Sequence, residues 1–185
     1  MIESRRNFFV VTGASGSGKS SVIAALRHRG HLCVDEIGRQ LVQEQVRQGG
    51  NVTPWQNHPA FMERVLTHSI QAFEAVDERL MPVFFDRGIP ECIGYARVLK
   101  LAVRAHHRAA AESFRYHPSV FVTPPWAEIY TTDAERRHSF EAGHEAHVEV
   151  LKAYRECGYA LIEVPKLPVE ERADFILHHA RQWLA

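Results

Sequence analysis

Short apolar runs alternate along the chain with longer stretches in which apolar residues recur every three or four positions. The short runs predict buried strands, and the longer spacing predicts helices with one face turned to a core. Such alternation indicates an α/β fold, here a three-layer arrangement with a five-stranded parallel sheet and helices on both faces. The strands are expected at 7–12, 32–34, 83–85, 119–123 and 159–164, and the helices at 19–29, 37–48, 59–80, 90–99, 103–115, 132–157 and 169–184.

The segment between the first expected strand and the first expected helix carries the most specific motif. It fits G-x-x-x-x-G-K-[ST], a phosphate-binding P-loop, in the strand–loop–helix setting that the motif requires. Glycines let the backbone approach an anion, and the loop N–H groups point at phosphate oxygens. Lys19 is placed to reach the β- and γ-phosphates, and the Ser20 hydroxyl is a Mg²⁺ ligand. The residues expected to bind ATP here are Gly13, Ala14, Ser15, Gly16, Ser17, Gly18, Lys19, Ser20 and Ser21.

Acidic residues follow two other expected strands, and parallel strands bring their carboxyl ends to one edge of a sheet. Asp86 follows the third strand, where a carboxylate can support Mg²⁺ beside Ser20. Asp35 and Glu36 follow the second strand, where one of them can accept the proton of an attacking hydroxyl. Either can instead cap the helix that comes next. Which of the two acts stays open at this point.

Arginines supply further cationic candidates. Arg136 and Arg137 lie between the fourth and fifth strands, in a capping-box segment within a helical lid expected at about 126–145. Basic residues are unfavourable at the positive start of a helix, and an anion held by the lid would explain them. We expect Arg136 to contact the transferring phosphoryl group. Arg87, after the third strand, can clamp an acceptor or form a structural salt bridge.

The lid region contains other residues that could carry chemistry. Glu141, His144 and His147 recur every three residues and can share one helix face. We interpret them as a polar lid helix rather than a metal site, because nothing supplies the outer partners that such a site needs. This helix is expected to break near Gly143. Trp126 is expected to serve packing, with a place in the acceptor pocket as the alternative.

Composition and charge narrow the class of protein. A length of 185 residues suits one domain, 1–185, and Lys+Arg equal Asp+Glu at 22 each. Nothing in the bulk charge therefore favours nucleic acid as a partner. No apolar run approaches the length of a membrane span. The three cysteines are scattered and odd in number, which is typical of reduced thiols in a cytoplasmic protein.

Four segments together resemble a known family. They are the P-loop, Asp35-Glu36-Ile37-Gly38-Arg39, Phe85-Asp86-Arg87-Gly88 and Thr132-Asp133-Ala134-Glu135-Arg136-Arg137. They look like the small family of predicted AAA-type ATPases that sits beside the nicotinamide-riboside kinase domain of NadR, and more widely like nucleoside and nucleotide kinases. The resemblance implies a P-loop kinase fold, with Asp86 as the Walker B-like acid and Arg136 as a lid arginine. It also implies that Arg39 contacts the acceptor and that the segment around Lys166 lies near the adenine.

The chain departs from AAA+ machines in two ways: it has no acidic Asp-Glu-x-x cluster after a later strand, and it has no room for their helical lid domain. We therefore expect an ATP- and Mg²⁺-dependent phosphotransferase that transfers the γ-phosphate to a small-molecule acceptor. The alternatives are a nucleotide-binding ATPase or switch without such an acceptor, and a nucleotide phosphohydrolase. No N-K-x-D guanine motif is present, which disfavours a GTPase. The acceptor and the oligomeric state stay open.

Overall fold

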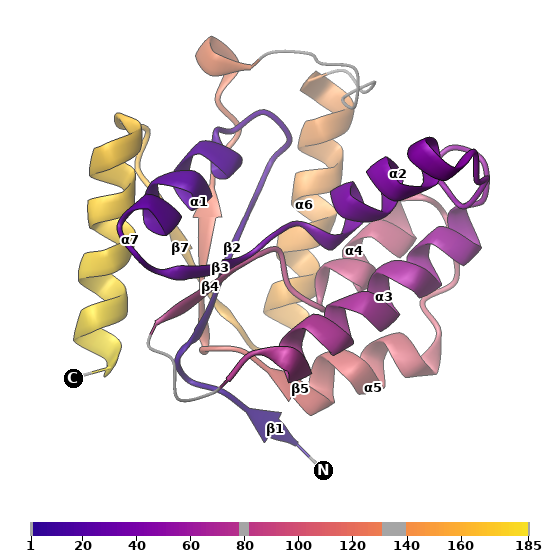
Figure 1. The fold of residues 1–185 in the computed structure, drawn as a ribbon, viewed down its shortest axis with the longest axis horizontal. Coiled ribbons are helices and arrows are strands. Elements are labelled where there is room, and N and C mark those ends of the chain that lie inside the picture. The colour runs from indigo at the N-terminus through magenta and orange to yellow at the C-terminus, as the bar shows by residue number, and fades with distance from the viewer. Residues whose placement is uncertain (1, 78–81, 131–139, 185) are drawn as a thin grey trace.

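A five-stranded parallel sheet forms the centre of the computed structural model, which describes residues 2–77, 82–130 and 140–184 (Figure 1). The strand order is β3-β4-β2-β6-β7, and every neighbouring pair is parallel. This sheet confirms the expected α/β fold. Its strands are β2 (Phe8–Gly13), β3 (Leu32–Val34), β4 (Val83–Asp86), β6 (Ser119–Thr123) and β7 (Ala160–Glu163).

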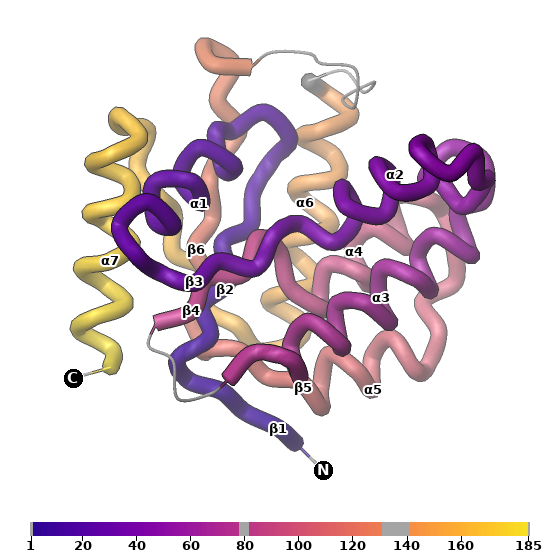
Figure 2. The backbone as a smooth tube through the Cα atoms, in the orientation of Figure 1, coloured from indigo at the N-terminus to yellow at the C-terminus, as the bar shows by residue number. Residues whose placement is uncertain are grey.

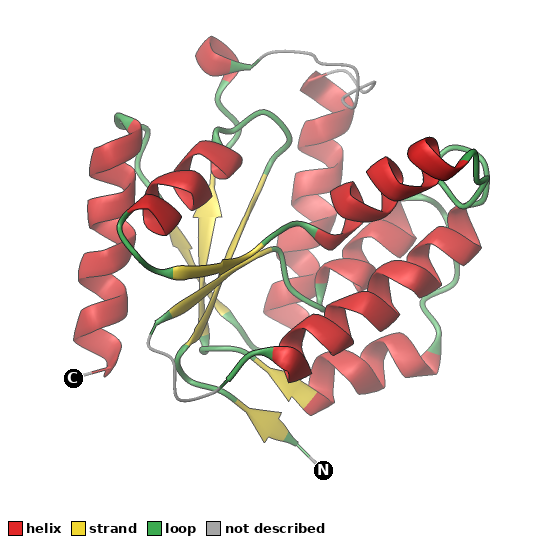
Figure 3. Cartoon of the chain, viewed as in Figure 1, coloured by secondary structure: helices red, strands yellow, loops and turns green. Residues whose placement is uncertain are grey.

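Helices cover both faces of the sheet. Helices α1 and α7 lie on one face and α2 to α6 lie on the other, so the fold has three layers (Figures 1 and 3). The bounds are α1 (Lys19–His28), α2 (Ile37–Gln48), α3 (His58–Ala75), α4 (Glu91–Val98), α5 (Ala105–Ser113), α6 (Phe140–Glu156) and α7 (Val169–Leu184), with a 3₁₀ turn η1 (Ala127–Ile129) after β6.

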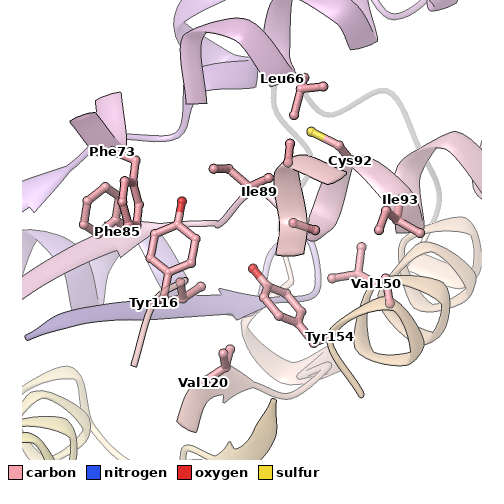
Figure 4. Packing of buried hydrophobic residues seen from close by; sticks show 14 of the residues in the cluster. Leu66, Phe73, Phe85, Ile89, Cys92, Ile93, Tyr116, Val120, Val150 and Tyr154 are labelled. Atoms are coloured by element: carbon pink, nitrogen blue, oxygen red, sulfur yellow. The ribbon is translucent and has the colours of Figure 1, made fainter. Parts of the chain in front are cut away.

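Strand β2 joins the two halves of the core, because successive side chains of a strand point to opposite faces. Phe8 and Val10 pack with the α3, α4 and α6 side, whereas Phe9 and Val11 pack with α1 and α7. All four side chains are fully buried. Figure 4 shows part of the larger cluster, in which Phe85 of β4 packs near Tyr116. A strand buried on both faces explains why the sequence shows an unbroken apolar run here.

Three details differ from the expectation. Helix α3 ends at Ala75 rather than near residue 80, and a short parallel pair, β1 (Glu3–Ser4) with β5 (Phe114–Arg115), lies outside the main sheet. Two-residue strands leave no periodic signal in a sequence. Helix α6 runs through Gly143 without the expected break, and Gly143 lies near Ser15 of the P-loop.

The carboxyl ends of β2, β3, β4 and β6 come together at one edge of the sheet (Figure 2). The P-loop follows β2, Asp35 and Glu36 follow β3, and Asp86 ends β4. In sheets of this kind, ligands bind beyond the carboxyl ends of the strands. Within the described ranges, no helix is long and apolar enough to cross a membrane.

Close packing of α4 against α6 gives a test of the fold. A Cβ added to Gly94 of α4 would lie 2.7 Å from the Val150 Cα, whereas one added to Gly38 of α2 would meet nothing nearer than Phe61 at 3.8 Å. Gly94→Ala should lower the free energy of unfolding by roughly 1–3 kcal/mol through overpacking. Gly38→Ala, the matched control, should raise it by roughly 0.5–1 kcal/mol through helix propensity. Urea unfolding measures both, and equal effects would contradict this packing.

Candidate active site

Thr123, at the end of β6, fixes the shape of the P-loop. Its carbonyl accepts a hydrogen bond from the Ala14 N–H at 3.3 Å, and its hydroxyl oxygen lies 2.7 Å from that of Ser17. The Ser17 hydroxyl also donates to the Ala14 carbonyl at 2.8 Å. A Cβ on Gly13 would overlap the Thr123 side chain, so only glycine permits this approach. Ser17, one of the residues expected to bind ATP, is buried, and its hydroxyl maintains the loop.

The P-loop places Lys19 in the interior at the start of α1. Gly18 precedes the helix with a φ of 77°, in the left-handed region that glycine adopts without strain. Lys19 is only 5% exposed, whereas Ser20 and Ser21 are exposed on the first turn of α1. The backbone N–H groups of this turn and the Ser20 hydroxyl form the kind of arrangement that binds phosphate oxygens.

Two carboxylates surround the Lys19 ammonium group. Asp86, at the end of β4, forms an ion pair with it through Oδ1, and the Glu36 Oε2 lies 3.5 Å from Nζ. Asp86 is 7% exposed and the Glu36 side chain 23%. The structure thus joins the ends of β2, β3 and β4 through one cation. The sequence predicted that these residues gather at one edge, and their positions agree with that.

The neighbours Asp35 and Glu36 have different surroundings. The Asp35 side chain is 56% exposed, and its Oδ1 accepts a hydrogen bond from Arg27 at 2.6 Å on the outer surface. Glu36 faces inward, toward Lys19 and Arg87. Glu36 is the N-cap residue of α2, but its side chain makes no capping hydrogen bond. The structure therefore brings Glu36 to the P-loop lysine, whereas Asp35, which also lines the cavity, pairs with Arg27 instead.

Arg87 continues the chain of charges beyond Glu36. Its Nε lies 2.9 Å from the Glu36 Oε1 and its Nη1 donates to the Glu91 Oε2 at 2.7 Å. Its guanidinium also lies over the Tyr95 ring, 5.5 Å from the centroid. Arg87 has a φ of 77°, which is unusual for a side-chain-bearing residue and is found most often at functional sites. Of the two roles expected from the sequence, the salt bridge is visible here.

Glu91 and Tyr154 belong to the same network, and sequence reasoning missed both. Glu91 is 3% exposed, and its Oε1 accepts a hydrogen bond from the Tyr154 hydroxyl at 3.0 Å. That hydroxyl in turn accepts from the Gly88 N–H at 3.0 Å. The i,i+4 spacing of Arg87 and Glu91 was a signal for one of these contacts. Tyr154 lies on α6, far along the chain, and left no such signal.

The network determines the charge of Glu36. Burial alone would raise the pKa of this carboxyl group, but the positive charges of Arg87 and Lys19 outweigh burial and lower its pKa to about 2. In the opposite direction, burial would lower the pKa of Arg87, yet Glu36 and its neighbours raise it above its ordinary value. At neutral pH Glu36 and Arg87 are therefore both ionised and form an ion pair.

A cavity of about 390 Å³ opens beside this row of charges. It begins at the P-loop, where Ser15, Lys19, Glu36 and Asp86 line it, and it extends between α2, α3, α4 and α6. Most of the residues deeper in the cavity are apolar. A ligand in this space would meet the Glu36 carboxylate at the end nearest the P-loop.

Arg172 of α7 is a third residue that the sequence did not indicate. It is 4% exposed, its Nη1 donates to the Ser17 carbonyl at 3.1 Å, and its guanidinium lies over the Trp126 ring at 5.4 Å. Burial lowers the pKa of Arg172. Trp126 therefore packs against α7 and is not among the residues that line the cavity, which fits the packing role expected for it.

The remaining predicted residues are placed as follows. Arg39 lines the cavity, and Lys166 is exposed in the segment after β7. Arg136 lies outside the described residues, as does Arg137. Of the expected lid, the described parts flank the P-loop: the Tyr130 ring packs on Gly16, and α6 begins nearby.

A group of possible metal ligands lies away from the P-loop, on α3 and α5. Glu63, His106 and His107 place their ligand atoms within 4.8 Å of one another. The Arg104 guanidinium lies 3.5 Å from the same Glu63 carboxylate. A fixed cation beside the only acid of the group disfavours a metal ion there.

Comparisons with known proteins agree with this geometry. One curated relative is a nucleotide-binding protein of Koribacter versatilis, which is 25% identical over 55% of this chain and 39% of the relative. Another is a nucleotide-binding protein of Acidithiobacillus ferrooxidans, which is 49% identical over 20% of this chain and 12% of the relative. The chain thus spans well under half the length of these relatives.

Two solved structures share the fold across nearly the whole chain. Shikimate kinase from Acinetobacter baumannii in complex with shikimate has a TM-score of 0.57 at 17% identity, covering 95% of this chain and 93% of that one. Deoxyadenosine kinase from M. mycoides with bound dATP has a TM-score of 0.62 at 13% identity, and the match covers 94% of this chain and 99% of that kinase. At such identities the likeness concerns the fold alone.

A family model described as an AAA domain matches residues 8–172, from the start of β2 into α7. The match includes the P-loop, Glu36, Asp86 and Arg172, so it spans every described residue of the charge network. The chain therefore belongs to this AAA-domain family, as its motifs led us to expect, and it has the fold of the P-loop kinases.

Proposed function

We propose that this protein is an ATP- and Mg²⁺-dependent phosphotransferase that acts on a small acceptor in the cytoplasm. The observation that carries the proposal is the position of Glu36, which lies between the P-loop lysine and a cavity large enough for a second molecule. A switch or a simple hydrolase needs the P-loop but has no use for a closed space beside it. The nucleotide-binding relatives and the kinase folds of the neighbours are consistent with this role.

The P-loop end supplies the donor. When a triphosphate occupies the loop, the Lys19 ammonium group can exchange its carboxylate partners for phosphate oxygens. The Ser20 hydroxyl and the Asp86 carboxylate are oxygen donors of the kind that Mg²⁺ prefers, so the residues present fit that ion. Bound Mg²⁺ would neutralise charge on the transferring phosphate group. Arg136, in the lid that we expect at 126–145 of this single domain, would add a further positive charge from the other side.

Glu36 would orient the acceptor and take its proton. The acceptor O–H bond breaks as the proton passes to a Glu36 oxygen, while the acceptor oxygen bonds to the γ-phosphorus and the bridging P–O bond to ADP breaks. Lys19 and Arg87 together hold the pKa of Glu36 low in the structure. When Lys19 turns to the phosphates, Glu36 loses one of these two neighbouring positive charges and keeps Arg87. Its pKa then rises, and Glu36 becomes a stronger base. Nucleotide binding would in this way prepare the base for the acceptor.

Turnover should depend on an acceptor. With Mg·ATP alone, we expect slow ADP formation, because a filled and closed site is needed to exclude water from the γ-phosphate. A panel of alcohols, sugars and nucleosides should contain members that raise ADP formation several-fold. If no acceptor stimulates turnover while a partner protein changes nucleotide affinity, the chain acts as a switch and the proposal fails.

The two neighbouring acids give a matched pair of variants. Glu36→Gln keeps the size of the side chain but removes the proton acceptor, so kcat for transfer should fall by roughly 10²–10⁴-fold with little change in KM for ATP. Asp35→Asn, one residue away at a carboxylate that pairs with Arg27 and not with Lys19, should leave both constants near their original values. Steady-state assays of both variants decide the point. Equal losses in the two, or a loss only in Asp35→Asn, would contradict the role of Glu36.

The lowered pKa of Glu36 also predicts how stability depends on pH. The pKa is 4.5 for the ordinary group and about 2 in the folded protein, so the ionised carboxylate stabilises the fold above pH 4.5 and this contribution is lost toward pH 2. The difference in unfolding free energy between the original protein and Glu36→Gln should stay constant from about pH 7 to about pH 5 and shrink below that. Urea unfolding at several pH values measures it. A difference that does not change down to about pH 3 would show that Glu36 is not held by its cationic neighbours.

A further inference from the structure

We infer that the acceptor is an alcohol with an apolar body, rather than a nucleoside or a sugar. This inference rests on the proposed phosphotransferase activity and names the class of molecule that the same site takes. It follows from the walls of the cavity that opens beside Glu36.

Four helices, strand β4 and the segment before β6 build the walls from apolar side chains. Phe85 of β4 and Tyr116, which precedes β6, lie on one side, and across from them lie Cys92 of α4 and Val150 of α6 (Figure 4). Helices α2, α3 and α4 complete the wall with Ile37, Val42, Phe61, Met62, Val65, Ala72, Tyr95, Val98 and Leu99. A volume of about 390 Å³ lies within the range of roughly 300–1,000 Å³ for small-molecule sites. The cavity therefore has the size and the lining for an apolar ligand.

The loop between α2 and α3 closes part of this wall through defined contacts. The Gln45 side chain, 6% exposed, accepts a hydrogen bond from the Val52 N–H at 3.1 Å. The Thr53 carbonyl accepts bonds from the N–H groups of residues 56 and 57 at 3.3 and 3.1 Å. These bonds position Trp55, whose large ring lines the cavity. The Gln45 side-chain oxygen is thus occupied with the backbone.

Apart from the P-loop and from the acids and bases of the lining, which include Asp35 and Arg39, the side chains there that can hydrogen-bond a ligand are few: Trp55, Ser69, Tyr95, Tyr116 and His147. Among the described lining residues there is no Asn or Gln. Beyond the P-loop end, the His147 ring is neutral at pH 7, because burial and neighbouring positive charge lower its pKa to about 4. The phenols of Tyr95 and Tyr116 are also neutral, since burial raises their pKa values, so these three side chains can form hydrogen bonds but carry no charge. A nucleoside or a sugar carries more hydrogen-bonding groups than these few side chains can satisfy, so burying it here would cost binding energy.

The charged end of the cavity favours a hydroxyl group over an acidic head group. The Arg87 guanidinium is engaged by two carboxylates, Glu36 and Glu91, at 2.9 and 2.7 Å. The Glu36 oxygens can accept a proton from a hydroxyl but would repel an anion. An apolar chain or ring along the walls, with one hydroxyl at Glu36, satisfies both ends of the cavity.

The test uses a matched pair of valines on α2. Val42 lines the cavity, whereas Val46, one turn later on the same helix, is 65% exposed. Isothermal titration with geraniol and with cinnamyl alcohol, in the presence of Mg²⁺ and a non-hydrolysable ATP analogue, measures binding. Val42→Thr keeps the shape of the side chain but places a hydroxyl against the ligand, so affinity should fall roughly tenfold. Val46→Thr should bind as the original protein does, and thermal unfolding confirms that both variants are folded.

Deoxyadenosine, shikimate and glucose are titrated and assayed beside the apolar alcohols. Binding and phosphorylation of an apolar alcohol, weakened by Val42→Thr, support both the inference and the proposed function. Binding without phosphorylation overturns the phosphotransferase while the class of ligand stands. Phosphorylation of a nucleoside or sugar, with no binding of the apolar alcohols, overturns this inference and leaves the phosphotransferase. If neither apolar alcohol binds, the inference is wrong.

Discussion

The buried ammonium group of Lys19 is the interaction on which the rest of the site depends. It lies between Asp86 and Glu36, and so holds the ends of three parallel strands at one point. Glu36 then pairs with Arg87, and Arg87 with Glu91, so that acids and bases alternate from the P-loop to α4. Removal of one member would leave its neighbour charged and buried, which costs roughly 3–5 kcal/mol. The P-loop and the cavity are therefore parts of one electrostatic unit.

Much of this arrangement could be predicted from the sequence because two strong local signals point the same way. Short apolar runs located the five strands, and the P-loop between β2 and α1 set the edge at which ligands bind. Parallel strands bring their carboxyl ends together, which is why their places directly after strands marked Asp86 and Glu36 as candidates. The sequence could not decide which of Asp35 and Glu36 faces the P-loop lysine. Adjacent side chains face opposite ways in extended chain, and only the fold decides which of them is inside.

The parts that sequence reasoning missed depend on contacts between distant segments. Glu91 and Tyr154 are 63 positions apart, and Arg172 reaches Ser17 across 155 positions. The cavity is likewise a product of helix packing: α4 approaches α6 closely at Gly94, while Gln45 holds the loop that carries Trp55. No periodic pattern marks such contacts. They matter most for function, because they determine what can lie beside the P-loop lysine.

The central claim is that Lys19 is shared between Glu36 and the phosphates, so that nucleotide binding changes the basicity of Glu36. Carbon-13 NMR of the Glu36 carboxyl group, titrated with and without Mg²⁺ and a non-hydrolysable ATP analogue, tests this directly. The account predicts a pKa of about 2 without nucleotide and a clearly higher pKa with it. The same pKa in both states would mean that Lys19 does not leave Glu36, and would contradict the account.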